Sequence, residues 1–401
     1  MTTVTATDAD LPAQAMNYSI VGGADAALFT IDGVSGVLGF LAAPDYETPL
    51  DAGTDNVYDV TVQVDDGAGG TDTQAISITV FPVNDNDPVI TSDGGGATAT
   101  VNVAENTTAV TTVTATDADL PAQTMNYSIV GGADAALFTI DGVTGALSFL
   151  AAPDYEGPAD TGADNVYDVT VQADDGAGRT DTQAIAVSVT PVNDNPPVIT
   201  SDGGGASASL NVAENTTAVT TVTATDADLP AQAMNYSIVG GADAALFTID
   251  GVSGALGFVA APDYETPLDA GSDNVYDVTV QVDDGNGLTD TQAIAVTVAN
   301  VNEPPVITSD GGGATAGVNV AENVNAVTLV TSIDVDGGAP NYTIAGGADA
   351  AFFTIDNVSG ALSFLAARDY ESPLDAGTDN VYDVTVQVDD GSAASTPRPS
   401  A

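Results

Sequence analysis

A repeat of about 109 residues is the feature that most constrains how this 401-residue chain can fold. The motif TATDAD occurs at Thr5–Asp10, Thr114–Asp119 and Thr223–Asp228, and a variant of it ends at Asp336. Successive copies are 109, 109 and 108 residues apart, and the motifs DYE, NVYDVTVQ and AEN recur in the same order. A period of this length matches a whole domain and is too long for a solenoid unit.

The phase of the two chain ends predicts incomplete outer repeats. The first repeat starts after the position of the AEN motif, and the last reaches Asp390-Gly391 without the TDTQAIAVSV segment that follows in the second repeat. We therefore predict four repeats, at residues 1–85, 86–194, 195–303 and 304–401. The first should lack its first strand and the last its last strand, as in a fragment of a longer array.

Short alternating segments predict β-strands within each repeat. In the second repeat Tyr167, Val169 and Val171 alternate with polar residues, which is typical of a half-buried strand. The DGVTG segment at 141–145 predicts a hairpin turn. Further strands are expected at 98–104, 110–116, 125–130, 138–140, 146–150 and 185–189. About seven strands per repeat and no sustained helical period favour an all-β array of immunoglobulin-like, seven-stranded antiparallel β-sandwiches.

Composition excludes most kinds of chemistry. The chain has 57 Asp and Glu residues against three Lys and Arg, a formal net charge of -54, and no His or Cys. Nucleic acids and anionic membranes need clustered positive charge, and catalysis by His or Cys is excluded. Yet 44% of the residues are apolar, enough to form cores. The remaining side chains offer oxygen ligands, which suit hard cations such as calcium.

The ordered motifs AEN, FTID-x-V-[ST]-G, DYE, VNDN-x-P and TATDAD resemble the cadherin repeat, in the form found in large bacterial surface proteins. The resemblance extends to about Asp390. It implies a seven-stranded Greek-key sandwich, with Ca²⁺ ions bound between consecutive repeats by residues from both repeats and from their linker. Where the match fails, Pro82 and Pro191 stand in place of an aspartate that the family usually has.

Carried onto this sequence, the resemblance implies one set of ligands for each junction. Between the first and second repeats these are Asp45, Glu47, Asn84, Asp85, Asn86, Asp117, Asp119 and Asp175. Between the second and third repeats they are Glu105, Asp154, Glu156, Asn193, Asp194, Asn195, Asp226, Asp228 and Asp284. Between the third and fourth repeats they are Glu214, Asp263, Glu265, Asn300, Asn302, Glu303, Asp334, Asp336 and Asp390.

An insert with Asp51 and Asp55, repeated at Asp160 and Asp164, has no place in the animal pattern of the family. Two interpretations are open for it: an extra cation-binding loop, or a solvated hairpin, which we favour.

The resulting hypothesis is a non-enzymatic, calcium-binding extender segment of a secreted or cell-surface bacterial adhesin, in which calcium stiffens the junctions for cell adhesion. Carboxylates that recur in every repeat indicate a structural role and not a single active centre. One alternative is a carbohydrate-binding or homophilic adhesion module, whose partner would be a cell-surface glycan or another adhesin copy. Another is a halophilic structural array without specific ion sites. Nucleic-acid binding and direct membrane insertion are not expected.

Overall fold

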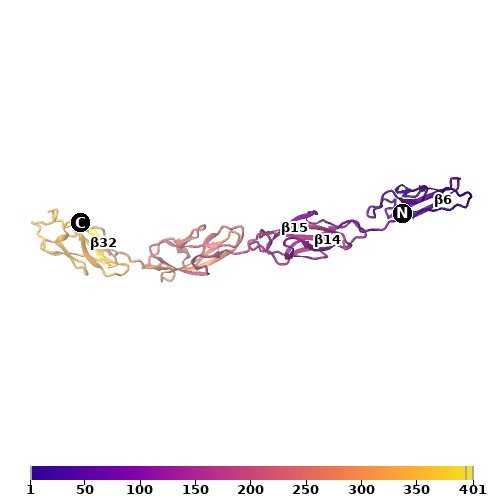
Figure 1. Ribbon diagram of the computed structural model, residues 1–401. Helices are drawn as coiled ribbons and strands as arrows, with labels where there is room; N and C mark the ends of the chain where they lie inside the picture. Colours follow the sequence, from indigo (N-terminus) through magenta and orange to yellow (C-terminus); the bar gives the residue numbers. More distant parts are fainter. Residues whose placement is uncertain (1, 393–394, 400–401) are drawn as a thin grey trace. The chain divides into compact units, whose positions relative to one another are not determined.

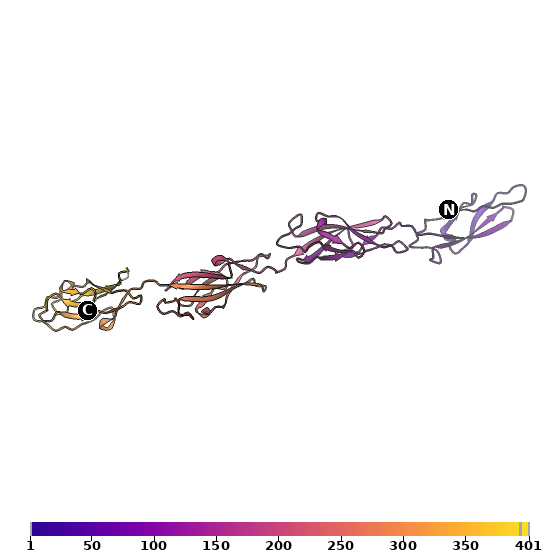
Figure 2. The same cartoon turned by 90° about the horizontal axis from the view of Figure 1, so that it is seen from below.

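The computed structural model describes residues 2–392 and 395–399. Within these residues the chain forms strands and short 3-10 turns, with no α-helix, and none of the helical turns could span a membrane. The chain divides into two units, residues 1–192 with 228–230 and residues 193–227 with 231–401. The same two layers of strands recur along the chain (Figures 1 and 2).

The second repeat contains a four-stranded sheet packed on a three-stranded sheet. The first has the order β11 (Asn126–Gly131), β14 (Val166–Asp174), β15 (Thr180–Thr190) and β8 (Thr98–Ala104). The second has the order β12 (Phe138–Ile140), β13 (Ala146–Phe149) and β9 (Ala109–Thr112), and β7 (Val89–Ile90) pairs with β10 (Ala115–Thr116). Only β8 runs parallel to its neighbour, β15; the other pairs are antiparallel. The all-β sandwich fold is thus confirmed.

The third repeat has the same topology. Its sheets are β17 (Ser207–Ala213), β24 (Thr289–Ala299), β23 (Val275–Asp283) and β20 (Asn235–Gly240); β18 (Ala218–Thr221), β22 (Ala255–Phe258) and β21 (Phe247–Ile249); and β16 (Val198–Ile199) with β19 (Ala224–Thr225). The 3-10 turns η1 to η7 are Ala26–Leu28, Ser92–Gly94, Ala135–Leu137, Ser201–Gly203, Ala244–Leu246, Ser309–Gly311 and Ala350–Phe352.

Alternation along the strands builds one apolar core in each repeat. In β14, Tyr167, Val169 and Val171 are at most 1% exposed, and they meet Phe138 and Phe149 from the facing sheet. The two phenylalanine rings stack with centroids 4.5 Å apart, and the Tyr167 ring packs edge-on against Phe149. Each buried side chain of this size stabilises the fold by about 1.5–3 kcal/mol. Among the described residues four such cores occur, and the predicted repeat boundaries lie between successive cores. The division into four repeats is our proposal.

The first repeat has fewer strands than the two central ones. Its sheets are β2 (Asn17–Gly22), β5 (Val57–Asp65) and β6 (Thr71–Thr79), and β1 (Thr2–Thr3), β4 (Val37–Phe40) and β3 (Phe29–Ile31). No counterpart of β8 pairs with β6 among the residues that the structure describes.

The fourth repeat differs from the sequence-based expectation in one respect. Its sheets are β28 (Asn341–Gly346), β31 (Thr385–Asp389) and β32 (Ser395–Pro399); β26 (Ala326–Leu329), β30 (Ala361–Phe364) and β29 (Phe353–Ile355); and β25 (Val306–Ile307) with β27 (Ser332–Ile333). We expected no strand after β31, yet β32 pairs antiparallel with it. Backbone pairing does not require the repeat's own sequence, so a dissimilar segment can occupy part of this edge.

The fourth core is nevertheless open. A cavity of about 420 Å³ lies among Phe353, Phe364 and Val384, next to residues 316–322. In the third repeat the strand β24 fills this place with Ile294, Val296 and Val298, all at most 1% exposed. The open core therefore follows from the shorter final strand.

Replacing residues 392–401 with residues 286–299 should stabilise the fourth repeat by several kcal/mol, at about 1.5–3 kcal/mol for each buried aliphatic side chain. Amide hydrogen exchange of residues 381–388, read by mass spectrometry, would measure the gain in protection. A matched graft with serine at the three aliphatic positions should give little protection. Equal protection by both grafts would show that the cavity is not what weakens this repeat.

Candidate metal sites at the repeat junctions

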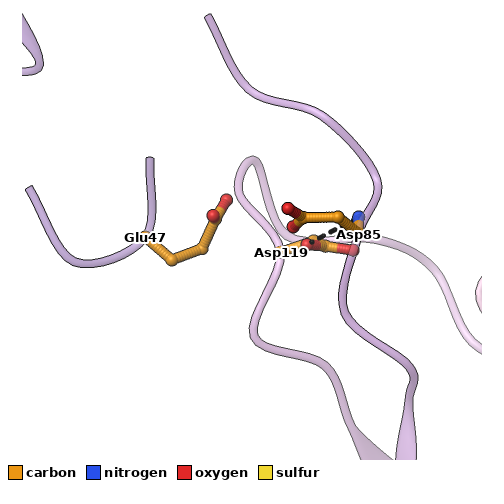
Figure 3. A group of neighbouring side chains, drawn as sticks. All are labelled: Glu47, Asp85 and Asp119. Atoms are coloured by element: carbon orange, nitrogen blue, oxygen red, sulfur yellow. Dashed lines mark hydrogen bonds between the residues drawn. The ribbon is translucent and has the colours of Figure 1, made fainter. Parts of the chain in front are cut away.

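Carboxylates from two repeats and their linker meet at the first junction, which lies within residues 1–192. Glu47 follows β4, Asp85 lies in the linker between β6 and β7, and Asp119 follows β10 (Figure 3). One oxygen from each lies within 4.8 Å of the others, and Asp119 is only 2% exposed. At an effective dielectric near 20, each pair of charges at this separation repels by about 3 kcal/mol. The arrangement is therefore unfavourable without a counter-charge.

A second cluster shares Asp119 with Asp117 and Asp175, again within 4.8 Å. One oxygen of Asp117 accepts the backbone N–H of Asp119 at 2.8 Å, while its other oxygen, Oδ2, is buried and has no hydrogen-bond partner. An ionised carboxylate can only accept, so a buried oxygen beside two further carboxylates needs a donor or a cation. This donor set fits a hard divalent ion, and calcium accepts six to eight such oxygens.

Hydrogen bonds keep these acids charged and fixed. The side-chain amide of Asn86 donates to Asp119 at 2.8 Å and holds the pKa of that carboxyl below its ordinary value. Burial by itself raises the pKa of Asp175, but the backbone N–H groups of Ala177 and Arg179 outweigh it and lower the pKa. Both acids therefore stay ionised at neutral pH, as ligands to a cation must.

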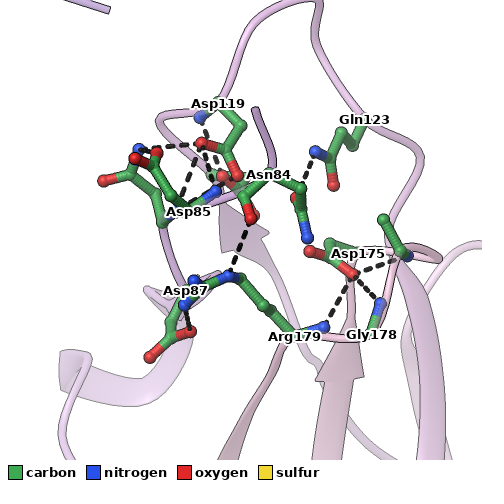
Figure 4. A network of polar contacts seen from close by, with 11 residues as sticks. Asn84, Asp85, Asp87, Asp119, Gln123, Asp175, Gly178 and Arg179 are labelled. Carbon is green, nitrogen blue, oxygen red and sulfur yellow. Dashed lines mark hydrogen bonds and ion pairs between the residues drawn. The ribbon is translucent and has the colours of Figure 1, made fainter. Parts of the chain in front are cut away.

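The remaining residues predicted for this junction hold its loops. Asp45 accepts the Thr48 hydroxyl at 2.6 Å, which lowers the pKa of Asp45, and it also accepts the Glu47 backbone N–H. The side-chain oxygen of Asn84 lies 2.6 Å from the Gln123 amide (Figure 4). The sequence interpretation missed Gln123, although a glutamine recurs at this place in the LPAQ loop of three repeats.

The third and fourth repeats form an equivalent cluster within residues 231–401, together with Glu214. Carboxylate oxygens of Glu214, Glu265 and Asp336 lie within 4.8 Å of one another. Glu265 accepts the Asn300 amide at 2.8 Å with one oxygen, while its Oε2 is buried without a partner. Burial, together with the charges of Glu214 and Asp336, raises the pKa of Glu265. A cation would relieve this repulsion.

Linker and loop residues surround the cluster of Glu214, Glu265 and Asp336. Glu214, 2% exposed, accepts the backbone N–H groups of Tyr264 and Val301 at 2.8 and 2.7 Å. Four further hydrogen bonds join the predicted ligands: Glu265 N–H donates to Asp263, the Asn302 amide to Asp390, Glu303 N–H to Asp336, and Asp336 N–H to Asp334. Asp334 Oδ2 is buried without a hydrogen-bond partner. The structure thus brings together the residues predicted for this junction.

The residues predicted as ligands between the second and third repeats divide between the two units. In the first unit Glu105 accepts the N–H groups of Tyr155 and Val192 at 2.7 and 2.6 Å, and Asp154 accepts Glu156 N–H. Burial and the charge of Glu105 raise the pKa of Glu156. This unit also contains Asp228.

In the second unit the amide of Asn195 donates to Asp194 at 2.8 Å, and Gln232 donates to Asn193. Asp284 caps its own loop by accepting the N–H groups of Asn286 and Gly287. Asp226 belongs to this unit as well.

In the aspartate insert the structure buries one of the two acids, which the favoured interpretation as a solvated hairpin did not predict. Asp160 is 6% exposed, and its two oxygens accept the N–H groups of Asp164 and Asn165 at 3.0 and 3.1 Å. Asp51 makes the same bonds in the first repeat. Backbone donors supply the partners of this buried carboxylate, whereas Asp55 and Asp164 are exposed, so the solvated interpretation is wrong for one of the two acids of the insert. The alternative of a cation-binding loop stays a prediction.

Residues 99–190 and 208–299 each match the cadherin domain. The chain contains tandem cadherin repeats. Over 398 residues it is 32% identical to human Protocadherin Fat 1, covering 96% of this chain and 8% of that protein. It thus spans about a twelfth of that curated relative.

Solved cadherin structures share the fold. Extracellular cadherin domains 3–6 of protocadherin gamma B2 align with a TM-score of 0.52 at 22% identity, covering all of this chain and 93% of that one. Extracellular cadherin domains 1–4 of protocadherin gamma B7 align with a TM-score of 0.52 at 19% identity, covering 96% and 92%. The cadherin resemblance is therefore confirmed at the level of the repeat. The named curated relative is an animal protein, and the predicted bacterial source stays a prediction.

Proposed function

We propose that this chain is a calcium-binding segment of an extracellular adhesion protein, in which bound calcium fixes each linker against the two repeats it joins. The observation that carries the proposal is the shared origin of the carboxylate clusters. At the first junction Glu47, Asp85 and Asp119 come from one repeat, the linker and the next repeat. A cation held by all three would tie three separate segments together.

The chain's own residues prepare the site. Asp175 and Asp284 are held charged by backbone donors in their loops, and the linker amide of Asn86 orients Asp119. Calcium, when bound, would supply the positive charge that these acids lack and would accept their oxygens without a strict geometry. Without it, repulsion among the carboxylates favours opening of the linker, so the junction should be ordered only in the presence of the cation.

A role in adhesion is supported by the cadherin repeats and by their likeness to extracellular cadherin domains. The proposal does not depend on the source organism. No specific observation favours a carbohydrate-binding platform, which would need an exposed aromatic side chain at the same place in every repeat. The most exposed aromatic side chains of the described residues are Phe81, Tyr264 and Tyr370. Tyr264 and Tyr370 share the DYE motif but represent only two repeats, and Phe81 lies in a different motif. The alternative of a halophilic structural array makes a different prediction from the calcium proposal: sodium or magnesium should order the linkers as well as calcium does.

Substitution Glu265→Gln should change the third junction in opposite directions with and without calcium. Without calcium, removing one of three clustered charges should increase the protection of residues 298–306 from hydrogen exchange. With calcium, loss of a charged ligand should weaken binding by roughly tenfold, which corresponds to about 1.4 kcal/mol. Isothermal titration of the chelator-stripped chain would measure the affinity, and exchange mass spectrometry would measure the protection.

Asp277→Asn is the matched control, because Asp277 is an exposed strand residue of the same repeat. It removes one negative charge away from the cluster and should leave both readouts unchanged. The calcium proposal would be rejected if the Glu265→Gln chain bound calcium as tightly as the parent, or if sodium ordered the linkers as well as calcium does.

A further inference from the structure

The first junction contains a positively charged side chain that the corresponding loops of the neighbouring repeats do not have. Arg179 follows the DDG motif of the second repeat, where the first and third repeats have Gly70 and Leu288. Its guanidinium reaches back to the linker: Nη1 lies 2.6 Å from an oxygen of Asp87, and Nε donates to the backbone oxygen of Asn84 at 3.2 Å (Figure 4).

The partner of this arginine, Asp87, also occurs in the first linker and not in the two later ones. Asp87 stands where the two later linkers have Pro196 and Pro304. Both members of the ion pair therefore depart from the repeat pattern, and they do so at the same junction. The pair joins a loop of the second repeat to the linker that precedes it, 92 residues earlier in the sequence.

The ion pair between Arg179 and Asp87 contributes too little to folding stability to explain why both residues occur at this junction. The side chains of Arg179 and Asp87 are 36% and 66% exposed, and ion pairs at such surfaces contribute about 0–1 kcal/mol. Their position is more informative, because the guanidinium lies beside the acids of the candidate site. After the hydrogen bond from Asn86, the charge of Arg179 is a further cause that lowers the pKa of Asp119. Arg179 also occupies the carbonyl oxygen of Asn84, and backbone carbonyls are among the oxygens that bind calcium.

We propose that Arg179 is a built-in cation that weakens calcium binding at the first junction, so that this junction loads at a higher calcium concentration than it would without the arginine. This inference rests on the proposed calcium-binding function. The guanidinium repels an incoming dication and withholds the Asn84 carbonyl. In the absence of calcium it also offsets part of the repulsion between Asp85 and Asp119. The first linker should therefore depend less on calcium for its order than a linker without such a residue.

The third repeat supplies a substitution that should keep the loop intact. Leu288 donates its N–H to Asp284 at 3.1 Å and accepts the Asp284 N–H at 3.2 Å. Arg179 makes the same two backbone bonds with Asp175, at 3.0 and 3.2 Å. Arg179→Leu thus removes the charge while retaining a side chain that this loop already accommodates.

The test is a calcium titration of the full chain after treatment with chelator, followed by hydrogen exchange in residues 84–92 and, as an internal reference, in residues 298–306. Arg179→Leu should lower the midpoint for residues 84–92 by roughly three- to tenfold, as expected when a single positive charge near the ion is removed from a solvated site. The midpoint for residues 298–306 should not move. Asp87→Asn, which leaves the guanidinium without its counter-charge, should raise the midpoint for residues 84–92.

The outcomes separate this inference from the function on which it rests. If neither segment gains protection with calcium, the proposed function fails. If both segments gain protection but Arg179→Leu leaves the midpoint of residues 84–92 in place, calcium binding stands and the role of Arg179 is overturned. Higher sodium chloride should shrink the effect of Arg179→Leu, because salt screens charges at this exposed site; an effect independent of salt would also contradict an electrostatic role.

Discussion

Replacing Gly241 with alanine should destabilise the third repeat by about 3–6 kcal/mol, combining backbone strain with overpacking. Gly241 has a φ of +104°, which L-residues rarely adopt, and a Cβ there would lie 2.3 Å from the Asp277 carbonyl oxygen. That oxygen belongs to β23, so neither the loop nor the sheet can move without breaking its pairing. Hydrogen exchange of residues 275–283 would report the loss, with residues 166–174 of the second repeat as an internal reference.

Gly287→Ala is the matched control for the steric part. Gly287 has a similar φ of +110°, but nothing lies within 4 Å of a Cβ built on it. This substitution should cost only the backbone strain, about 1–3 kcal/mol. Equal losses for the two substitutions would show that β23 yields to the added methyl group and that the close approach does not restrict this position.

The strands were predictable because their pattern is local. Alternation located β8 and β12 to the residue, and the DGVTG turn between β12 and β13 was expected. The same alternation predicted one strand over 110–116, whereas the structure has β9 and β10 separated at Val113. The chain passes there from one sheet to another, with Val113 fully buried and its N–H bonded to Gly145. A change of sheet leaves no mark on the alternation, so the sequence could not show it.

The resemblance indicated which acids would lie close together at the junctions, and their role as metal ligands stays a prediction. It did not indicate the buried acids that hold the surrounding loops. Asp134 looks like a solvated turn residue in the sequence GGAD, yet it is 4% exposed and accepts the N–H groups of Thr161 and Asp168. Those partners lie 27 and 34 residues away. Arg179 likewise pairs with Asp87, which lies 92 residues earlier in the sequence. Contacts between residues so far apart in the sequence depend on the folded topology, and no motif spacing in the sequence indicates them.

Substitution Asp269→Ala should destabilise the third repeat by about 2–3 kcal/mol at neutral pH, because two backbone donors of the insert lose their acceptor. Asp269 is 4% exposed, and its oxygens accept the N–H groups of Asp273 and Asn274 at 3.0 and 3.1 Å. Burial by itself raises the pKa of Asp269, but these donors outweigh it and hold the pKa below the ordinary value of 3.8. Urea unfolding, followed by hydrogen exchange in residues 275–283, would measure the loss.

The same loss should disappear in acid. A lowered pKa in the folded state means that the ionised carboxylate stabilises the fold above about pH 3.8, and that this stabilisation is lost as the pH falls through the lower folded-state pKa. The difference in unfolding free energy between the parent chain and Asp269→Ala should therefore be constant from pH 7 to about pH 5 and narrow below pH 3.8. Asp277→Ala, which removes an exposed acid from the adjoining strand, should give no comparable loss at pH 7. A difference that stayed constant down to pH 2.5 would mean that the insert needs the shape of the aspartate side chain and gains nothing from its charge.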